Sequence, residues 1–397
     1  MESLQQKYYE KYAHTQLKTI RDFINTIDWS DRLIGIKGSR GVGKTTLLLQ
    51  YLKKNFKPDH KTLYVSLDNL YFTEHKLYHL ADEFYKKGGE LLVIDEVHRY
   101  PEWAVEIKNI YDDLPDLKII FTGSSLLHLH RAKADLSRRA VMYEMPGLSL
   151  REFISFETKK DQPQFPLTEI LDHHIEIAAD ITGQYKPLEY YSKYIRHGYY
   201  PFYLENINTF HQRLGEILIT VLEIDIPQFE SIQVSNIIYL KKLLKIISRS
   251  VPFKPNMKSV SERTGISLNT LKTYLSYLND ARVLSMLMVE EKGMGNLGKP
   301  EKLYLDNPNL IYNLSENDAE AGNIRETFFF NQTSVNHEVH ASKAVDFTID
   351  SQYHFEIGGK SKSKKQIKNL ESSYVVRDNS AIGAGNIIPL WLFGFLY

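Results

Sequence analysis

Residues 38–45 read Gly-Ser-Arg-Gly-Val-Gly-Lys-Thr, which matches G-x-x-x-x-G-K-[ST] at every fixed position. They follow the apolar run 33–36, so a strand, a glycine-rich turn and a helix should aim several backbone N–H groups at one anion. We expect Lys44 to reach the β- and γ-phosphates of a nucleotide and Thr45 to offer its hydroxyl to Mg²⁺. The predicted ATP- and Mg²⁺-binding loop comprises Gly38, Ser39, Arg40, Gly41, Val42, Gly43, Lys44, Thr45 and Thr46.

A second candidate element is the segment 90–96, in which an apolar run after Glu90 ends in Asp95 and Glu96. Such a run is typical of a buried parallel strand whose carboxyl end faces a ligand. Asp95 would then belong to the Mg²⁺ shell, and Glu96 would orient or deprotonate the attacking water. The alternative is a strand that simply ends in solvated acids, but the phosphate-binding loop about fifty residues upstream favours a joint site.

A third element comprises the β-branched segment 117–121 and the small polar residues after it. We expect Ser124 or Ser125 to touch the γ-phosphate or the water. Arg138 and Arg139 follow, and either could stabilise transition-state charge within its own chain or across a subunit interface of a homo-oligomer. The alternative for each arginine is an ordinary solvated or salt-bridged surface role.

Composition limits the other classes of function. The chain has 397 residues and no cysteine, which predicts several domains and excludes disulfides and thiolate metal sites. The amino-terminus lacks the apolar core of a signal peptide. The apolar tail 387–397 is too short to span a bilayer and is predicted to be a terminal core strand, so we expect a cytoplasmic protein without a membrane partner.

The order of apolar segments predicts an α/β fold with a parallel sheet. Residues 1–30 should be helical and polar, and further strands are expected at 61–67 and 141–144. The predicted domains are a P-loop domain at 1–148, a helical lid at 149–235, a winged helix at 236–306 and a small α+β domain at 307–397. The tyrosines of the lid are interpreted as core residues, because residues 151–230 hold 13 acidic against seven basic side chains.

Positive charge concentrates at residues 241–300, which hold 11 Lys and Arg against four Asp and Glu. Within this region, 259–278 has the rhythm of a helix-turn-helix, with Ser267 as the cap of the second helix. We expect Leu268, Leu271, Leu275 and Leu278 to share its buried face. Segments 283–289 and 302–305 would pair as a wing, so residues 259–305 could bind double-stranded DNA, or pack only against a protein partner.

These motifs together resemble prokaryotic AAA+ ATPases of the archaeal-type group. The resemblance rests on residues 38–46, 94–103, 122–125, 136–139, 148–153 and 304–307. It implies an α/β P-loop NTPase of the AAA+/ASCE type that hydrolyses ATP, with Ser124 as polar sensor and Arg139 as the arginine after the strand. Arg138 stands where the family often has glycine, which leaves open which arginine acts.

The resemblance also implies a restriction-nuclease-like domain at the carboxyl end. Such domains place an Asp and a Glu-x-Lys on adjoining strands to bind a divalent metal. Asp346 and Glu356 approximate this pattern, with Glu326 as a helix acid, but Gly358 replaces the lysine. Lys360 or Lys362 could substitute for it. We therefore favour a degenerate, non-cleaving domain over an active metal site.

The sequence thus predicts an ATPase that couples hydrolysis to DNA binding. A nucleotide-switched protein-interaction module without DNA binding is the alternative, and a metal-dependent nuclease is a weaker one.

Overall fold

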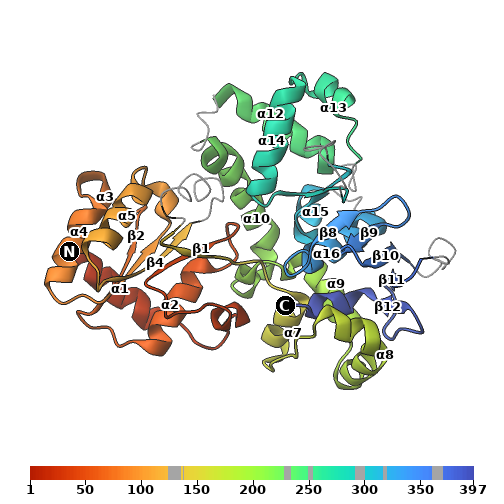
Figure 1. The fold of residues 1–397 in the computed structure, drawn as a ribbon, viewed down its shortest axis with the longest axis horizontal. Helices are drawn as coiled ribbons and strands as arrows, with labels where there is room; N and C mark the ends of the chain where they lie inside the picture. The colour runs from red at the N-terminus through yellow and green to blue at the C-terminus, as the bar shows by residue number, and fades with distance from the viewer. Residues whose placement is uncertain are drawn as a thin grey trace. The chain divides into compact units, whose positions relative to one another are not determined.

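The structure is a computed structural model that describes residues 1–123, 136, 138–227, 234–248, 254–290, 300–315, 320–359 and 370–397. The chain forms two compact units, Met1–Gly147 and Leu148–Tyr397 (Figure 1). The further division of the second unit into lid, winged helix and terminal domain remains a prediction. No described helix is long and apolar enough to cross a membrane.

The first unit is built on a parallel sheet of five strands in the order β2-β3-β4-β1-β5. The strands are β1 (Leu33–Lys37), β2 (Thr62–Ser66), β3 (Leu91–Asp95), β4 (Lys118–Gly123) and β5 (Val141–Glu144). Their positions agree with the predicted strands, and the predicted α/β fold with a parallel sheet is confirmed. Since all strands are parallel, the ends of β1, β3 and β4 meet at one edge of the sheet.

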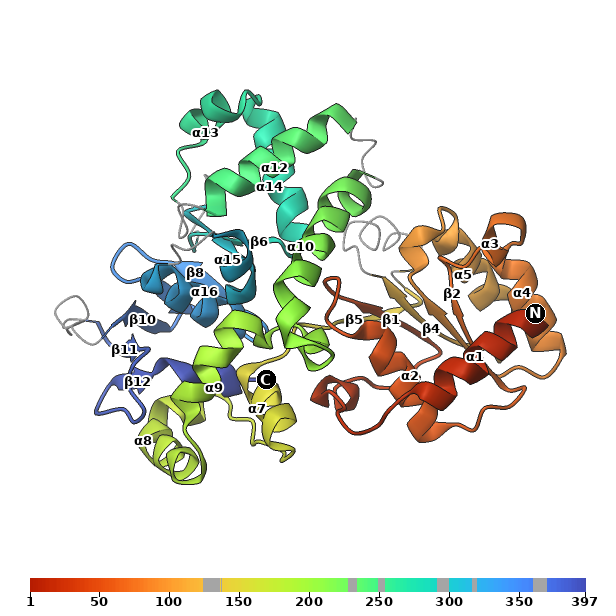
Figure 2. The ribbon, with the colours of Figure 1, turned by 180° about the vertical axis from the view of Figure 1, so that it is seen from behind.

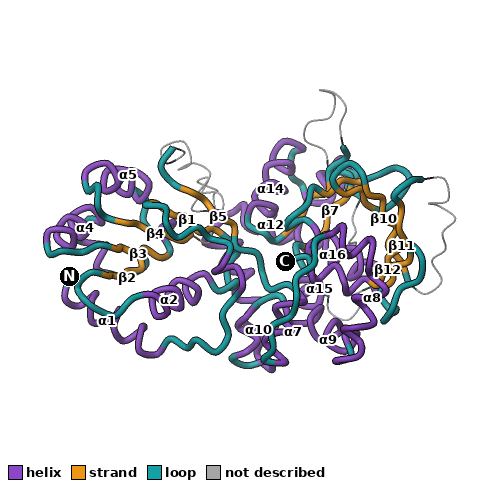
Figure 3. Tube along the Cα trace, turned by 60° about the horizontal axis from the view of Figure 1, so that its bottom comes forward, coloured by secondary structure: helices purple, strands orange, loops and turns teal. Residues whose placement is uncertain are grey.

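Helices cover both faces of this sheet (Figure 3). Helices α1 (Glu2–His14) and α2 (Lys44–Asn55) lie side by side on one face (Figure 2), whereas α4 (Leu77–Lys86) and α5 (Trp103–Asp113) pack on the other. The short helices α3 (Tyr71–Glu74) and η2 (Val97–Arg99) follow β2 and β3. The prediction of helix throughout residues 1–30 was too broad, because α1 ends at His14 and only the 3₁₀ turn η1 (Asp22–Asn25) follows.

The second unit begins with helices. Ser149 and Glu152 form a capping box that starts α7 (Leu150–Thr158), since each side chain satisfies a backbone N–H of the other residue. The helical elements that follow are α8 (Leu167–Gln184), α9 (Pro187–Lys193), the π-helix η3 (Tyr194–Gly198), η4 (Pro201–Leu204), η5 (Ile207–Thr209), α10 (Phe210–Thr220) and η6 (Val221–Asp225).

The π-helix η3 is held by a side chain from a distant helix. Asn309, in α15 (Pro308–Leu314), is fully buried and donates from Nδ2 to the carbonyl oxygens of Tyr194 and Ile195 at 2.9 Å each. Its Oδ1 accepts from the backbone N–H of Tyr199 at 2.9 Å. One amide side chain therefore satisfies three backbone groups around η3.

The predicted helix-turn-helix corresponds to α13 (Met257–Thr264) and α14 (Leu268–Asp280), beside α12 (Val234–Ser248). Ser267 accepts from the backbone N–H of Thr270, as the capping prediction required. The prediction of Leu268 on the buried face was wrong, since Leu268 is 45% exposed and Tyr274 is buried. Leu268 is the first residue of the helix, and packing is carried by the stripe Leu271, Tyr274, Leu275 and Leu278.

Two further sheets complete the second unit. Strands β6 (Leu284–Leu287) and β7 (Lys302–Leu305) pair antiparallel, at the segments predicted for the wing. A mixed sheet in the order β12-β11-β10-β9-β8 packs on α16 (Ala321–Thr333). Its strands are β8 (Val339–Ala341), β9 (Phe347–Ile349), β10 (Tyr353–Gly358), β11 (Ser373–Arg377) and β12 (Ile387–Pro389).

The apolar tail is not one terminal strand, contrary to the prediction. After β12 the chain turns into the 3₁₀ helix η7 (Leu390–Phe395), whose six residues are buried. Pro389 explains the change, because its ring fixes φ at −62° and it has no N–H for the sheet.

Candidate active site

The phosphate-binding loop joins β1 to α2 and adopts the backbone geometry that its glycines allow. Gly41 and Gly43 have φ of 88° and 97°, the left-handed region that other residues avoid. A Cβ on Gly38 would lie 2.4 Å from the carbonyl oxygen of Met145, so this position also requires glycine. Lys44 is buried, and its Nζ donates to the carbonyl oxygens of Gly38 and Ser39 at 2.8 and 2.9 Å. The ammonium thus lies over the loop where phosphate is expected.

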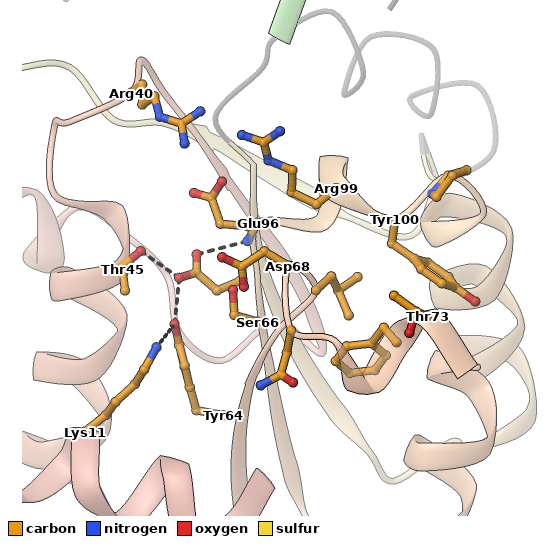
Figure 4. A pocket seen from close by; sticks show the side chains of 15 residues that line it. Lys11, Arg40, Thr45, Tyr64, Ser66, Asp68, Thr73, Glu96, Arg99 and Tyr100 are labelled. Atoms are coloured by element: carbon orange, nitrogen blue, oxygen red, sulfur yellow. Dashed lines mark hydrogen bonds between the residues drawn. The ribbon is translucent and has the colours of Figure 1, made fainter. Parts of the chain in front are cut away.

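Asp95 lies at the end of β3 and is 1% exposed. Its Oδ2 accepts from the hydroxyls of Thr45 at 2.6 Å and Tyr64 at 2.7 Å (Figure 4). Its Oδ1 accepts from the hydroxyl of Thr122. The structure therefore brings Thr45 and Asp95 together, as the two predicted metal ligands require. Their oxygens are donors of the kind that Mg²⁺ takes, together with phosphate and water, so this pair fits the ion that the fold implies.

Glu96 follows directly and has an unusual backbone, with φ of 54°. Its N–H donates to Asp95 Oδ1 at 3.1 Å and to Thr122 Oγ1 at 3.3 Å, which fixes this left-handed turn. Burial raises the pKa of the Glu96 carboxyl, and Asp95 adds to the rise, against the opposing effect of Lys44, Arg40 and Arg99. A carboxylate with a raised pKa is a better proton acceptor than a solvated one.

A cavity of about 780 Å³ opens beside these carboxylates (Figure 4). It runs from Thr45, Asp95 and Glu96 to Phe72 and Tyr100. Lys11 of α1 also lines it, and its Nζ lies 3.5 Å from the Tyr64 hydroxyl and 4.8 Å from the centre of the Tyr64 ring. The cavity has room for water between the loop residues Arg40 and Thr45 and the carboxylate of Glu96.

Arg139 does not join this cluster. Its guanidinium forms two hydrogen bonds with the Asp112 carboxylate, at 2.8 and 3.0 Å, and Asp112 lies in the last turn of α5. Arg139 comes just before β5, and the first residue of β5 pairs with β1 near the start of that strand. Arg32, which precedes β1, also bonds α5, because its guanidinium donates to the carbonyl oxygen of Tyr111. Arg139 is therefore at the amino-terminal edge of the sheet, roughly 15 Å of strand away from the phosphate loop.

The other predicted residues lie on the surface, along the loop or outside the described ranges. Arg138 is exposed beside Arg139. Ser124 and Ser125 lie outside the described residues, so the sensor prediction stays untested. Arg40 lines the cavity, Val42 is buried, and Thr46 lies in the first turn of α2.

Sequence reasoning missed four side chains that the structure adds to the site. Thr122 and Tyr64 donate to Asp95, Lys11 reaches Tyr64, and the buried His98 has Nε2 3.4 Å from Glu96 Oε2. Thr122 ends β4 at the ligand edge, a position that could have suggested it. Tyr64 and Lys11 carry no motif, because their approach depends on how β2 and α1 pack.

The predicted carboxyl-terminal acids are only partly brought together. Asp346 and Glu326 meet through Lys302 of β7, whose Nζ lies 3.3 and 3.0 Å from their carboxylate oxygens. Tyr304 also donates to Glu326 at 2.7 Å, and Glu356 is buried. Lys360 and Lys362 lie outside the described residues. The lysine beside these acids, Lys302 of β7, comes before both of them in the sequence. The described ranges contain no group of three or more His, Asp or Glu suited to a metal ion.

The strand order, the loop after β1 and the acid pair after β3 define the first unit as a P-loop NTPase fold. Residues 30–154 match the model of the family described as "AAA domain", and residues 188–321 match a "Domain of unknown function (DUF8612)". Most of the first unit is therefore similar to this AAA domain family. No sequence among the curated proteins matches this chain.

Among solved structures, the chain is similar to the Walker-type ATPase PABY2304 of Pyrococcus abyssi. The identity is 15%, the match covers 72% of this chain and 91% of that one, and the TM-score is 0.40. AMPPCP-bound DnaA from Aquifex aeolicus matches with 13% identity, over 70% of this chain and 88% of that one, at a TM-score of 0.26. At these TM-scores the fold assignment rests on the sheet and the loop.

Proposed function

We propose that this protein binds ATP with Mg²⁺ and hydrolyses it to ADP and phosphate. The observation that carries the proposal is the convergence of Thr45, Asp95 and Glu96 beside the phosphate-binding loop, where all three line one cavity. Phosphate binding, metal binding and water activation need these three groups within a few ångströms of each other.

Each residue has a distinct task in the proposed reaction. The loop N–H groups and Lys44 hold the phosphates, and Thr45 with Asp95 would hold Mg²⁺, which neutralises charge on the phosphate oxygens. Glu96 takes a proton from a water in the cavity as the water oxygen bonds the γ-phosphorus. The bond from that phosphorus to the bridging oxygen then breaks, and its electron pair leaves with ADP.

Steady-state ATP hydrolysis tests this proposal. Glu96→Gln should keep nucleotide affinity and lose about 10²- to 10⁴-fold in kcat, because the amide cannot accept the proton. Lys44→Ala should instead lose nucleotide binding, measured with a fluorescent ATP analogue. A wild-type rate that Glu96→Gln leaves unchanged would show that the hydrolysis belongs to a contaminant or to another site.

We also propose that hydrolysis is coupled to duplex DNA through residues 259–305. Support comes from the exposed face of α13 and α14, which presents Lys258, Arg263, Asn269, Lys272 and Thr273. Basic and polar side chains on one helical pair suit phosphate contact. DNA should stimulate the ATPase at low salt and less at moderate salt. Lys272→Ala should lower the salt dependence of the DNA affinity by about one released counterion. Lys7→Ala, at an exposed lysine on α1, should leave this salt dependence unchanged.

One observation favours a protein partner instead. Leu268 begins α14 with 45% of its surface exposed, and an apolar side chain at this place suits a protein contact better than a phosphate contact. If hydrolysis is indifferent to DNA, and Leu268→Ser weakens a partner complex that Lys272→Ala leaves intact, the interaction-module alternative replaces the DNA proposal.

If Arg139 acts on a nucleotide, it must act on that of another copy, because it lies at the far edge of its own sheet. We therefore propose a homo-oligomer in which Arg139 is supplied in trans.

A further inference from the structure

A carboxylate that serves as a base must present one oxygen to water and be prevented from turning away. Glu96 is surrounded by groups that could draw it elsewhere, since Lys44, Arg40 and Arg99 all attract its charge and Asp95 repels it. Its backbone is fixed by Asp95 and Thr122, but these bonds leave the side-chain torsions free. Some further group must hold the carboxylate.

His98 has the position for this task. Its side chain is completely buried, and its Nε2 lies 3.4 Å from Oε2 of Glu96, whose side chain is 22% exposed. The turn η2 between them is closed by two backbone hydrogen bonds, Arg99 N–H to Glu96 O at 2.9 Å and Tyr100 N–H to Val97 O at 3.0 Å. The closed turn fixes the His98 backbone, and complete burial restrains its imidazole, whereas the partly exposed Glu96 carboxylate has more room to adjust.

The distance of 3.4 Å fits a contact that tightens when the reaction partners bind. Catalytic hydrogen bonds are often long before substrate is present and shorten in the complex. A small rotation about the Glu96 side chain would bring Oε2 within donor reach of an Nε2–H. The other oxygen, Oε1, would then face the cavity, where the attacking water is expected.

We propose that His98 is a positioning residue that holds Oε2 of Glu96 and so directs Oε1 to the attacking water. This inference rests on the proposed ATPase function. In this proposal the turn after β3 supplies both the base, Glu96, and the side chain that orients it. The rate of ATP hydrolysis would then depend on His98, which contacts neither nucleotide nor metal.

The test compares His98→Gln, which keeps an N–H donor, with His98→Leu, which has similar bulk and no donor. His79→Gln, at an exposed histidine on α4, is the matched control. We measure kcat for ATP hydrolysis, the Kd of a fluorescent ATP analogue and thermal unfolding for each variant.

His98→Leu should lose about 10- to 100-fold in kcat with Kd within about twofold of wild type, as is typical when a residue that orients a functional group is removed. His98→Gln should recover most of the rate, and His79→Gln should match wild type.

Equal kcat in His98→Leu and wild type would overturn the inference while hydrolysis still depends on Glu96. Equal loss in the Leu and Gln variants, or a parallel loss of Kd, would assign His98 to packing alone. Hydrolysis that does not depend on Glu96 would instead overturn the proposed function and the inference with it.

Discussion

The hydroxyl of Tyr64 donates a 2.7 Å hydrogen bond to Oδ2 of Asp95, and the phenol is buried in doing so. Burial raises the pKa of Tyr64 far above its ordinary value, and the Asp95 carboxylate adds to the rise, so the phenol keeps its proton and remains a donor. A strand residue without any motif thus orients the carboxylate that is predicted to belong to the Mg²⁺ shell.

Tyr64→Phe should raise the Mg²⁺ concentration for half-maximal ATP hydrolysis by about 10-fold. Groups that orient a metal ligand typically contribute 10- to 100-fold to metal affinity. The measurement is a Mg²⁺ titration at saturating ATP. Tyr85→Phe removes an exposed hydroxyl that bonds Asp116 and serves as control. A lower Mg²⁺ requirement in Tyr64→Phe would show that the phenol competes with the ion.

Arg139→Ala and Asp112→Asn both break the same exposed ion pair, whose contribution to stability should be below about 1 kcal/mol. If Arg139 acts in trans, Arg139→Ala should lose hydrolysis while Asp112→Asn keeps it. Mixing Arg139→Ala with Lys44→Ala should then restore part of the rate, because one copy supplies the arginine and the other the loop. Two variants with the same mild effect, and no recovery on mixing, would limit Arg139 to the ion pair.

Lys302→Met should destabilise the second unit by about 3 kcal/mol, since it leaves Glu326 and Asp346 close together without their cation. Burial opposes the charge of Lys302, but these two carboxylates outweigh it and raise its pKa. The stability that the charged Lys302 contributes is therefore complete below its ordinary pKa of 10.5, and it is lost as the pH rises through the raised pKa.

Urea unfolding of Lys302→Met at pH 7 and at alkaline pH measures this difference. Lys254→Met, which removes an exposed partner of Glu301 at 3.7 Å, should cost less than about 1 kcal/mol. A stable Lys302→Met variant would mean that the two acids take up protons instead.

The second unit should lose stability in mild acid because of His197. Burial lowers the pKa of this imidazole to about 4, helped by the nearby His211, Lys193 and Arg196. The unfolded chain binds the proton below its ordinary pKa of 6.5, so stability falls between pH 6.5 and about 4. At pH 5 the loss that is due to His197 should be about 1 to 2 kcal/mol, and His197→Gln should remove this part. Burial also lowers the pKa of His211, which should keep a smaller response in the variant.

Thermal unfolding of wild type and His197→Gln across this range tests the prediction. The exposed His60→Gln should leave the pH dependence as in wild type. An identical acid response in wild type and His197→Gln would place the sensitivity in other groups.

The parts of the fold that were predicted correctly depend on local sequence. The loop around Lys44 and the strand that ends at Asp95 have residue types with few other uses, so their segments and their meeting at one sheet edge follow from the pattern. Ser267 is a similar case, because a cap bonds a backbone group only three residues away.

The parts that were not predicted depend on packing between distant segments. Leu268 fits a helical stripe by spacing, but the stripe uses Tyr274 instead. Lys302 approaches Asp346 only because β7 lies beside the terminal sheet, and Tyr64 approaches Asp95 only because β2 pairs with β3. Periodicity within one segment contains no information on such pairs.

The side chain of Asn309 has a consequence for the order in which the second unit assembles. The π-helix at Tyr194–Gly198 and the helix that begins at Pro308 are more than a hundred residues apart, yet the Asn309 amide bonds the carbonyl oxygens of Tyr194 and Ile195. We therefore expect η3 to reach its final form only when α15, which follows the β6–β7 pair, has docked. Backbone amides near Tyr199 should gain hydrogen-exchange protection together with those of α15, as one cooperative step.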